Sequence, residues 1–331
     1  MPLMGKKGSS KTTRLFYATD VHGSERTFRK FLNAGKFYEA QVLVLGGDII
    51  GKLAVPIIRE GSGGYRATLQ GTTEHIDSEE GLKALLDRLG LLGFYHKIMT
   101  EEEFRALAAD QAAVDGLFHT LARQRLEAWI ELANTRLGGT GIRCFVTGGN
   151  DDYPNVLEVM KTSGSQVFID CEGAVANIDE DHTMISVGNS TLTPWKTPRE
   201  VTDEELGRII DGMIAQVSDL HRCIFNFHDP PNDSTLDTCP ELDWTTDPPT
   251  PIVKAGQMVM HGAGSKSVRK AIETHQPMLG LHGHIHESSG AIKIGRTLCI
   301  NPGSEYGEGI LRGALITISS GEIKAHQLTS G

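Results

Sequence analysis

Short apolar runs that end in polar or glycine-rich stretches recur along the chain. Residues 14–19 form the first apolar run and end at Asp20, 24–34 show a helical pattern capped by Ser24, and 41–45 form a second apolar run. Short continuous apolar runs are typical of buried strands. A strand, a helix and a strand in this order predict a βαβ unit, so the chain begins as an α/β fold with a parallel sheet.

A long insertion separates this unit from the next strand of the same kind, which is expected at 142–147. The intervening pattern begins as a β-hairpin over 53–70 and then becomes helical over 78–92 and 101–137. We expect both ends of the insertion to emerge at the carboxyl ends of strands, which predicts a lid over a site or a surface for a homo-oligomer. We expect a disordered leader at 1–13, a main domain in two segments at 14–51 and 141–331, and a hairpin plus helical cap at 52–140.

The strand pattern resumes after the insertion and continues almost to the end of the chain. A proline-rich stretch after residue 228 predicts an ordered, extended loop without secondary structure. The expected helices lie at 203–219 and 265–274. The expected strands or apolar segments lie at 167–169, 174–178, 183–187, 223–227, 278–281, 291–294, 297–300, 310–318 and 322–328.

Composition narrows the range of partners. The 42 acidic and 32 basic residues give a net charge of -10, which offers no electrostatic support for a general nucleic-acid surface. An odd number of cysteines, five, lie far apart with no C-x-x-C pair, which favours a reducing, cytoplasmic location. No run of about 18 apolar residues is present, so we expect no membrane partner.

Residues that can bind metal follow the predicted strands repeatedly. Each of these short motifs alone is more often a turn or a helix cap than a metal ligand, but their order after successive strands favours a common site. Open α/β sheets bind ligands at strand ends, and a carboxylate that bridges two ions among imidazole ligands gives a dinuclear centre. The motifs are Asp20-Val21-His22, Gly47-Asp48, Gly149-Asn150-Asp151-Asp152, His228 and Gly283-His284-Ile285-His286.

These five blocks, in this order, resemble the calcineurin-like metallophosphoesterase superfamily. The stretch Asn301-Pro302-Gly303-Ser304 resembles its prokaryotic phosphodiesterase branch. The resemblance covers about 14–51 and 141–319 and leaves out the insertion. It implies an α/β fold, a four-layer α/β/β/α sandwich with a mainly helical insertion, which carries two metal ions at its strand ends.

The resemblance also implies the ligands of each ion, with Asp48 as the bridge. The reaction it implies is hydrolysis of a phosphate ester by a metal-activated hydroxide. Two divalent ions are expected, and Mn²⁺, Fe, Zn²⁺ and Ni²⁺ all suit these side chains. The first ion would be held by Asp20, His22, Asp48 and His286, and the second by Asp48, Asn150, His228 and His284.

One position departs from the family pattern. Many members carry a histidine after the metal-binding asparagine, and it protonates the leaving group, whereas this chain has Asp151. Two adjacent dications lower the pKa of a carboxyl group, so Asp151 is expected to be a poor general acid. The candidate catalytic residues are Asp151, Asp152 and His261, the last because it could reach the second metal.

The leading hypothesis is an enzyme that hydrolyses a small phosphodiester or nucleotide-type ester, with the cap limiting access. One alternative is a nuclease, which needs a basic track beside the metals; another is a non-catalytic metal-binding scaffold, which missing ligands would indicate. The arginines that could form such a track lie in the insertion, and they are Arg59, Arg66, Arg123, Arg125 and Arg136.

Overall fold

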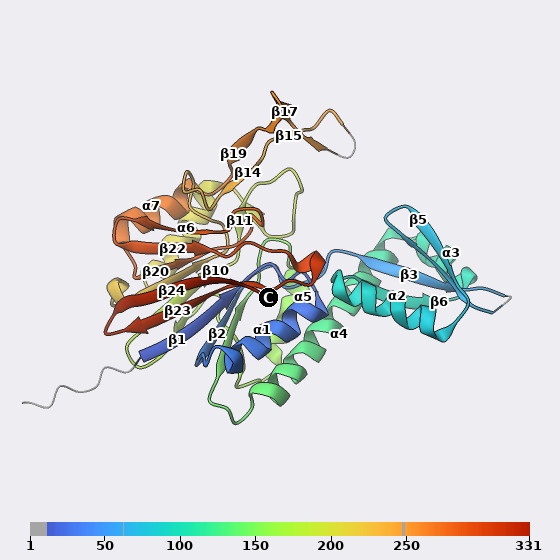
Figure 1. Ribbon diagram of the computed structural model, residues 1–331, viewed down its shortest axis with the longest axis horizontal. Coiled ribbons are helices and arrows are strands. Elements are labelled where there is room, and N and C mark those ends of the chain that lie inside the picture. The colour runs from blue at the N-terminus through green and yellow to red at the C-terminus, as the bar shows by residue number, and fades with distance from the viewer. Residues whose placement is uncertain (1–11, 62, 247–248) are drawn as a thin grey trace, which may run out of the picture.

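Two six-stranded sheets form the centre of the main domain (Figure 1). The computed structural model describes residues 12–61, 63–246 and 249–331. The first sheet has the order β24-β23-β1-β2-β7-β8, formed by Glu322–Ser330, Arg312–Ser319, Thr12–Ala18, Val42–Gly46, Arg143–Thr147 and Phe168–Asp170. The second has the order β21-β22-β20-β13-β10-β9, formed by Gly290–Ile294, Thr297–Asn301, Leu279–Leu281, Cys223–Phe227, Thr183–Val187 and Val175–Asn177.

Each sheet has a parallel centre. Strands β1, β2, β7 and β8 are parallel, as are β10, β13, β20 and β22, while antiparallel strands occupy the remaining edges. Parallel strands end on the same side of their sheet, so the loops that follow them gather at one edge. That edge carries the predicted metal-binding motifs.

The alternation of side chains along the strands builds the layers. Leu15 and Tyr17 of β1 face a core between the two sheets, whereas Phe16 and Ala18 face the helices on the outer side of the first sheet. These helices are α1 (Glu25–Phe37), α4 (Gln111–Leu137) and α5 (Pro154–Thr162). Helices α6 (Asp203–Ile214) and α7 (Lys266–His275) cover the outer face of the second sheet. The predicted four-layer α/β/β/α sandwich is confirmed.

The insertion has a core of its own. Its four strands have the order β5-β4-β3-β6 and are formed by Thr72–Ile76, Tyr65–Leu69, Ala54–Arg59 and Tyr95–Met99. Helices α2 (Glu79–Leu91) and α3 (Glu101–Ala108) accompany them, and Ile57, Leu85 and Leu89 are buried together. The hairpin of β3 and β4 matches the sequence pattern, but β5 and β6 were not predicted. Strand β5 buries only Ile76 and β6 buries only Tyr95 and Met99, so neither shows the alternation that marks a strand.

Helix α4 belongs to both parts of the molecule. It leaves the insertion and passes along the outer face of the first sheet, where Trp129 stacks on Phe28 with ring centroids 3.9 Å apart and an angle of 4° between the rings. It then leads into the amino end of β7, so it is the crossover helix that parallel strands β2 and β7 require. Only the first end of the insertion therefore emerges at a strand carboxyl end, contrary to the prediction for both ends.

The proline-rich stretch forms an arm rather than the predicted loop without secondary structure. Three short antiparallel ladders build it, and Figure 1 shows it projecting from the body of the molecule. In these ladders β14 (Thr238–Pro240) pairs with β19 (Met260–Gly262), and β15 (Leu242–Asp243) pairs with β16 (Thr250–Pro251). The third ladder pairs β17 (Val253–Lys254) with β18 (Gln257–Met258).

The chain termini differ little from expectation. Of the predicted leader, residues 1–11 lie outside the described part of the chain, while Thr12 and Thr13 already belong to β1.

All five cysteines are unpaired within the described residues. Across residues 12–331, leaving out 62 and 247–248, none of the helices combines the length and apolar character needed to cross a bilayer.

Replacing Trp129 with alanine tests whether α4 is part of the main core. Trp129 is 2% exposed, and truncation of a buried tryptophan leaves a cavity, so the free energy of unfolding should fall by about 3–5 kcal/mol. Val114→Ala, at an exposed position near the other end of the same helix, should change it by less than about 0.5 kcal/mol. Chemical denaturation measures both. Equal effects of the two substitutions would contradict the assignment of α4 to the core.

Candidate metal centre

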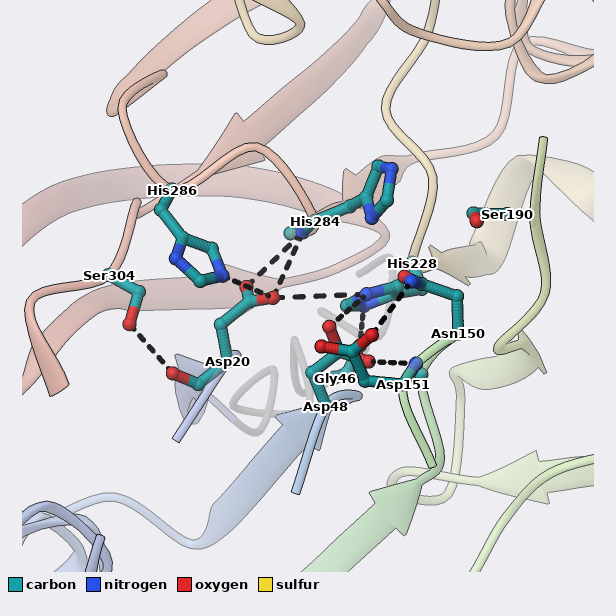
Figure 2. Close-up of polar contacts among 12 residues, drawn as sticks. Asp20, Gly46, Asp48, Asn150, Asp151, Ser190, His228, His284, His286 and Ser304 are labelled. Carbon is teal, nitrogen blue, oxygen red and sulfur yellow. Dashed lines mark hydrogen bonds and ion pairs between the residues drawn. The ribbon is translucent and has the colours of Figure 1, made fainter. Parts of the chain in front are cut away.

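All seven predicted metal ligands lie at the carboxyl ends of parallel strands from both sheets. Six of them form two groups whose donor atoms lie within 4.8 Å of one another. The first group is Asp20, His22, Asp48 and His286, and the second is Asp48, His228 and His284. Asp48 belongs to both groups, as expected of a bridging carboxylate. Figure 2 shows the seventh, Asn150, among the residues of the site, and its Nδ2 lies 3.5 Å from Oδ1 of Asp151.

Imidazole nitrogens and carboxylate oxygens point at each other at short range. The Nε2 atoms of His22 and His286 are 3.1 Å apart, and Nε2 of His228 lies 3.4 Å from Oδ2 of Asp48. Nε2 of His286 lies 3.4 Å from Oδ1 of Asp20. A cation would attract these lone pairs jointly, since carboxylate and imidazole are both common metal ligands.

The backbone at four ligands adopts an uncommon conformation. Asp20, His22, Asp48 and His284 have φ angles of 54°, 40°, 49° and 66°, in the left-handed region. Such angles are uncommon for residues other than glycine, and strained backbone concentrates at functional sites. The strand ends therefore turn sharply at the residues whose side chains converge.

Two glycines make this convergence sterically feasible. A Cβ atom at Gly149 would lie 2.1 Å from Oδ1 of Asp48, and one at Gly47, where φ is +119°, would lie 2.4 Å from Nδ1 of His228. Because neither neighbour can move without disturbing a ligand, only glycine fits at these positions.

Neighbouring groups orient two ligands so that one donor atom of each is left for a metal. Nδ1 of His228 donates to the carbonyl oxygen of Gly46 at 2.9 Å, and Nδ2 of Asn150 donates to Oγ1 of Thr197 at 2.8 Å. The remaining atoms, Nε2 of His228 and Oδ1 of Asn150, are buried and have no hydrogen-bond partner among the described residues. Hydrogen bonds of this kind set the tautomer and direction of metal ligands, so the residues fit a metal centre.

The local electrostatics keep both carboxylates ionised and the His284 ring neutral. Burial by itself would raise the pKa of Asp20, but His286 and His228 lower it to about 2. The pKa of Asp48 is also held well below its usual range, because His228 outweighs the effect of burial. Burial lowers the pKa of His284 to about 4, which leaves this ring neutral. Ionised carboxylates and neutral imidazoles are the ligand forms. Burial would lower the pKa of His228, but Asp48 and Asp20 raise it to about 10, so this ring has to release a proton when it binds a metal.

Asp152, one of the predicted catalytic residues, lies between two loops of the site. Its fully buried carboxylate accepts hydrogen bonds from the backbone N–H groups of Ile49 at 3.0 Å, Ile50 at 2.7 Å and Gly149 at 2.7 Å. It thus joins the loop that carries Asp48 to the loop that carries Asn150. A carboxylate with this set of donors positions other residues.

Asp151 lies beside the centre, paired with a lysine that the sequence analysis did not single out. Oδ2 of Asp151 is 2.7 Å from Nζ of Lys52 and 3.7 Å from Nδ1 of His22. Among the chain's own groups, burial and Asp48 raise the pKa of Asp151, and Lys52 opposes them. The lowering expected from the sequence depends on the ions themselves. Lys52 follows the Gly47-Asp48 block by four residues, and this proximity was the available signal.

Tyr306 lies next to the ring of His22, whereas His261, a predicted catalytic residue, lies in the arm. The ring of Tyr306, in a short 3₁₀ helix (Tyr306–Glu308), lies 4.6 Å from the His22 ring, centroid to centroid. His261 lies on β19 of the arm, is exposed, and contacts Sγ of Cys239 at 3.8 Å. His261 therefore belongs to neither of the two donor groups.

Comparisons with known proteins found solved structures with a similar fold over 97% of the chain, and a relative that matches part of its sequence. No protein-family model matches the chain. The uncharacterized protein MJ1162 of Methanocaldococcus jannaschii is 32% identical over 160 residues, which are 46% of this chain and 65% of that protein. The chain thus matches less than two thirds of the length of this curated relative.

Two crystal structures align with almost the entire chain. One is that of TT1561 from Thermus thermophilus, with 12% identity and a TM-score of 0.52. The other has 14% identity and a TM-score of 0.55. Each alignment covers 97% of this chain and 99% of the other. At these identities the likeness concerns the fold alone.

The shared position of Asp48 leads to a prediction about metal content. Asp48→Ala should remove both ions, because both donor groups lose a ligand, whereas His286→Ala should weaken only the first site. The metal content of purified, metal-equilibrated protein, measured by elemental analysis, checks this. An Asp48→Ala variant that is folded by circular dichroism and still holds two ions would rule out the bridge.

Proposed function

We propose that this chain, which has the metallophosphoesterase fold, is a hydrolase of phosphate esters that depends on two divalent metal ions. The observation that carries the proposal is the pair of buried His/Asp groups that share Asp48. The first ion would be held by Asp20, His22, Asp48 and His286, and the second by Asp48, Asn150, His228 and His284. Bound ions would supply a hydroxide at neutral pH and neutralise the charge of the phosphoryl group.

Lys52 is the protein's own cation at this site. Its ammonium group is held against Asp151, and its side chain remains 46% exposed, so it can also reach a phosphoryl oxygen of a bound ester. Hydrogen bonds from ammonium to phosphate are charge-assisted and stronger than neutral ones. We infer that Lys52 binds and orients the substrate phosphoryl group, at a position where the usual histidine is replaced by Asp151.

The substrate we propose is a small phosphodiester or a nucleotide-type ester. Figure 1 shows the arm above and the insertion to the right of the main domain, as segments added to the sandwich. A nuclease receives less support, because arginines of the insertion are engaged within the protein. Arg125 pairs with Glu25 at 3.0 Å, Arg66 pairs with Glu101, and Arg123 donates to the carbonyl oxygen of Asn155.

Hydrolysis by metal-stripped and reconstituted protein tests the proposal. The protein should be inactive after chelation and should regain activity towards bis(p-nitrophenyl) phosphate or p-nitrophenyl phosphate with Mn²⁺, Fe²⁺, Zn²⁺ or Ni²⁺. His228→Ala should abolish the recovered activity. Absence of hydrolysis with every metal, in protein that binds two ions, would favour the metal-binding scaffold instead.

Neutralising Lys52 should weaken catalysis without affecting metal binding. Loss of a hydrogen bond to a charged group costs about 1.5–3 kcal/mol, so Lys52→Met should lower kcat/KM for the diester by about 10- to 150-fold, and Lys52→Arg should lower it less. Lys161→Met, at an exposed position on α5, is the matched control and should have no effect. Unchanged kcat/KM in Lys52→Met would exclude a role for this lysine in substrate binding.

A further inference from the structure

Two exposed tryptophans from distant parts of the sequence contact each other. Trp195 is 63% exposed and Trp244 is 47% exposed. Their ring centroids are 5.4 Å apart, and the ring planes are inclined by 66°. Trp195 lies in the loop between the short paired strands β11 (Ser190–Thr191) and β12 (Glu200–Val201), while Trp244 follows β15 in the arm. Large aromatic side chains left open to solvent are typical of binding sites.

The loop that carries Trp195 is attached to the metal centre at both of its ends. Near its end, Oγ1 of Thr197 accepts the hydrogen bond from Nδ2 of the ligand Asn150 at 2.8 Å. At its start, the backbone N–H and the hydroxyl of Thr191 donate to Oδ2 of Asp229 at 2.7 and 2.9 Å. Asp229 directly follows the ligand His228. One end of this loop is therefore hydrogen-bonded to Asn150 and the other to the neighbour of His228, and Asn150 and His228 are both expected to hold the second ion.

The loop is rigidly braced although its tip is exposed. The Glu200 carboxylate accepts hydrogen bonds from the backbone N–H groups of Thr193 at 3.0 Å and Thr197 at 2.9 Å, and from both of their hydroxyls. The N–H of Trp195 donates to Oγ1 of Thr193 at 3.1 Å. Because consecutive Cα atoms are about 3.8 Å apart, the Cα of Trp195 lies within about 8 Å of that of Thr197. The backbone that carries the indole is thus fixed before a ligand arrives.

We propose that Trp195 and Trp244 bind the planar base of the substrate, and that the substrate is therefore a nucleotide-type ester. This inference rests on the proposed function. Both indole side chains are largely exposed, and any of the nucleic-acid bases can stack on an exposed indole face. The negative net charge and the paired arginines disfavour a long strand, so the ligand is a single nucleotide unit, with its phosphate at the metals and its base on the tryptophans.

A second copy of the chain is the competing occupant of this surface. The arm also exposes Val253, Met258 and Met260, which self-association would cover. The substrate base is favoured because the Trp195 loop is hydrogen-bonded to the metal ligand Asn150, an arrangement that a dimer contact does not need. Sedimentation velocity of the wild type and the tryptophan variants serves to separate the two occupants.

Fluorescence of the metal-free protein tests base binding independently of activity. The chain has three tryptophans, and the third, Trp129, is buried. Titration with adenosine 5′-monophosphate should quench the exposed pair, whereas ribose 5-phosphate, which lacks the base, should not. In Trp195→Phe the quenching of Trp244 should persist, because phenylalanine still stacks. Equal responses to both ligands, or no response to either, would overturn the inference.

Kinetics with two diesters that share a leaving group complete the test. Stacking is worth about 1–3 kcal/mol per base, so Trp195→Ala and Trp244→Ala should each lower kcat/KM for thymidine 5′-monophosphate p-nitrophenyl ester by about 5- to 150-fold. Both variants should leave methyl p-nitrophenyl phosphate unaffected. Leu192→Ala, another exposed apolar position of the same loop, is the control and should change neither value.

The outcomes separate this inference from the function on which it rests. Metal-dependent hydrolysis of both esters that is insensitive to the tryptophans would reject the base site and keep the phosphoesterase. Quenching by the nucleotide without hydrolysis of either ester would keep the base site and reject the phosphoesterase. A wild-type dimer that dissociates in both alanine variants, together with no quenching by the nucleotide, would assign the surface to self-association and overturn the inference.

Discussion

The buried carboxylate of Asp48 is the constraint on which the arrangement of the centre depends. A charge removed from water is tolerated only where opposite charges or hydrogen bonds surround it. Asp48 is 2% exposed, and it lies near His22 and His228 and accepts the backbone N–H of Asp151 at 2.9 Å. Both sheets therefore have to present their strand ends to the same point. The two-sheet architecture and the centre are consequences of the same requirement.

The surrounding backbone shows how closely this requirement is met. Asp152 holds the Asp48 and Asn150 loops together through three N–H donors. Gly149 allows the Asp48 carboxylate to approach its backbone more closely than any side chain would permit. Left-handed backbone at four ligands is stable only because such neighbours determine it from several sides. The predicted ligand set is thus held in its converging form by residues outside that set.

We propose that parts outside the sandwich contribute access and recognition. The insertion has its own core, but its last helix serves the main domain as the crossover between β2 and β7. The arm brings Trp244 against Trp195 of a loop that is fixed to Asn150. In this proposal the chemistry is concentrated at the sheet edge, while the side chains that choose a substrate come from the flanking segments.

The sequence by itself determined those features that local patterns encode. The strands at 183–187 and 223–227 and the cap at Ser24 match the structure, because apolar runs and a serine before a helix act over a few residues. The order of the ligand blocks after successive strands also identified the residues that meet, since parallel strands end at one edge. Largely polar strands such as β5 and the ladders of the arm carry weak patterns, so they were missed or expected as loop.

Only the tertiary structure decided which distant side chains become partners. Three pairings join segments that share no local pattern in the sequence. Lys52 pairs with Asp151, Asp152 accepts from the N–H groups of Ile49 and Ile50, and Trp195 contacts Trp244. The same holds for α4, whose apolar positions recur along its whole length, although its buried residues all lie from Ala122 onward. The spacing of apolar residues in the sequence specifies which face of a helix or strand is apolar. The packing of whole layers determines which residues that face contacts.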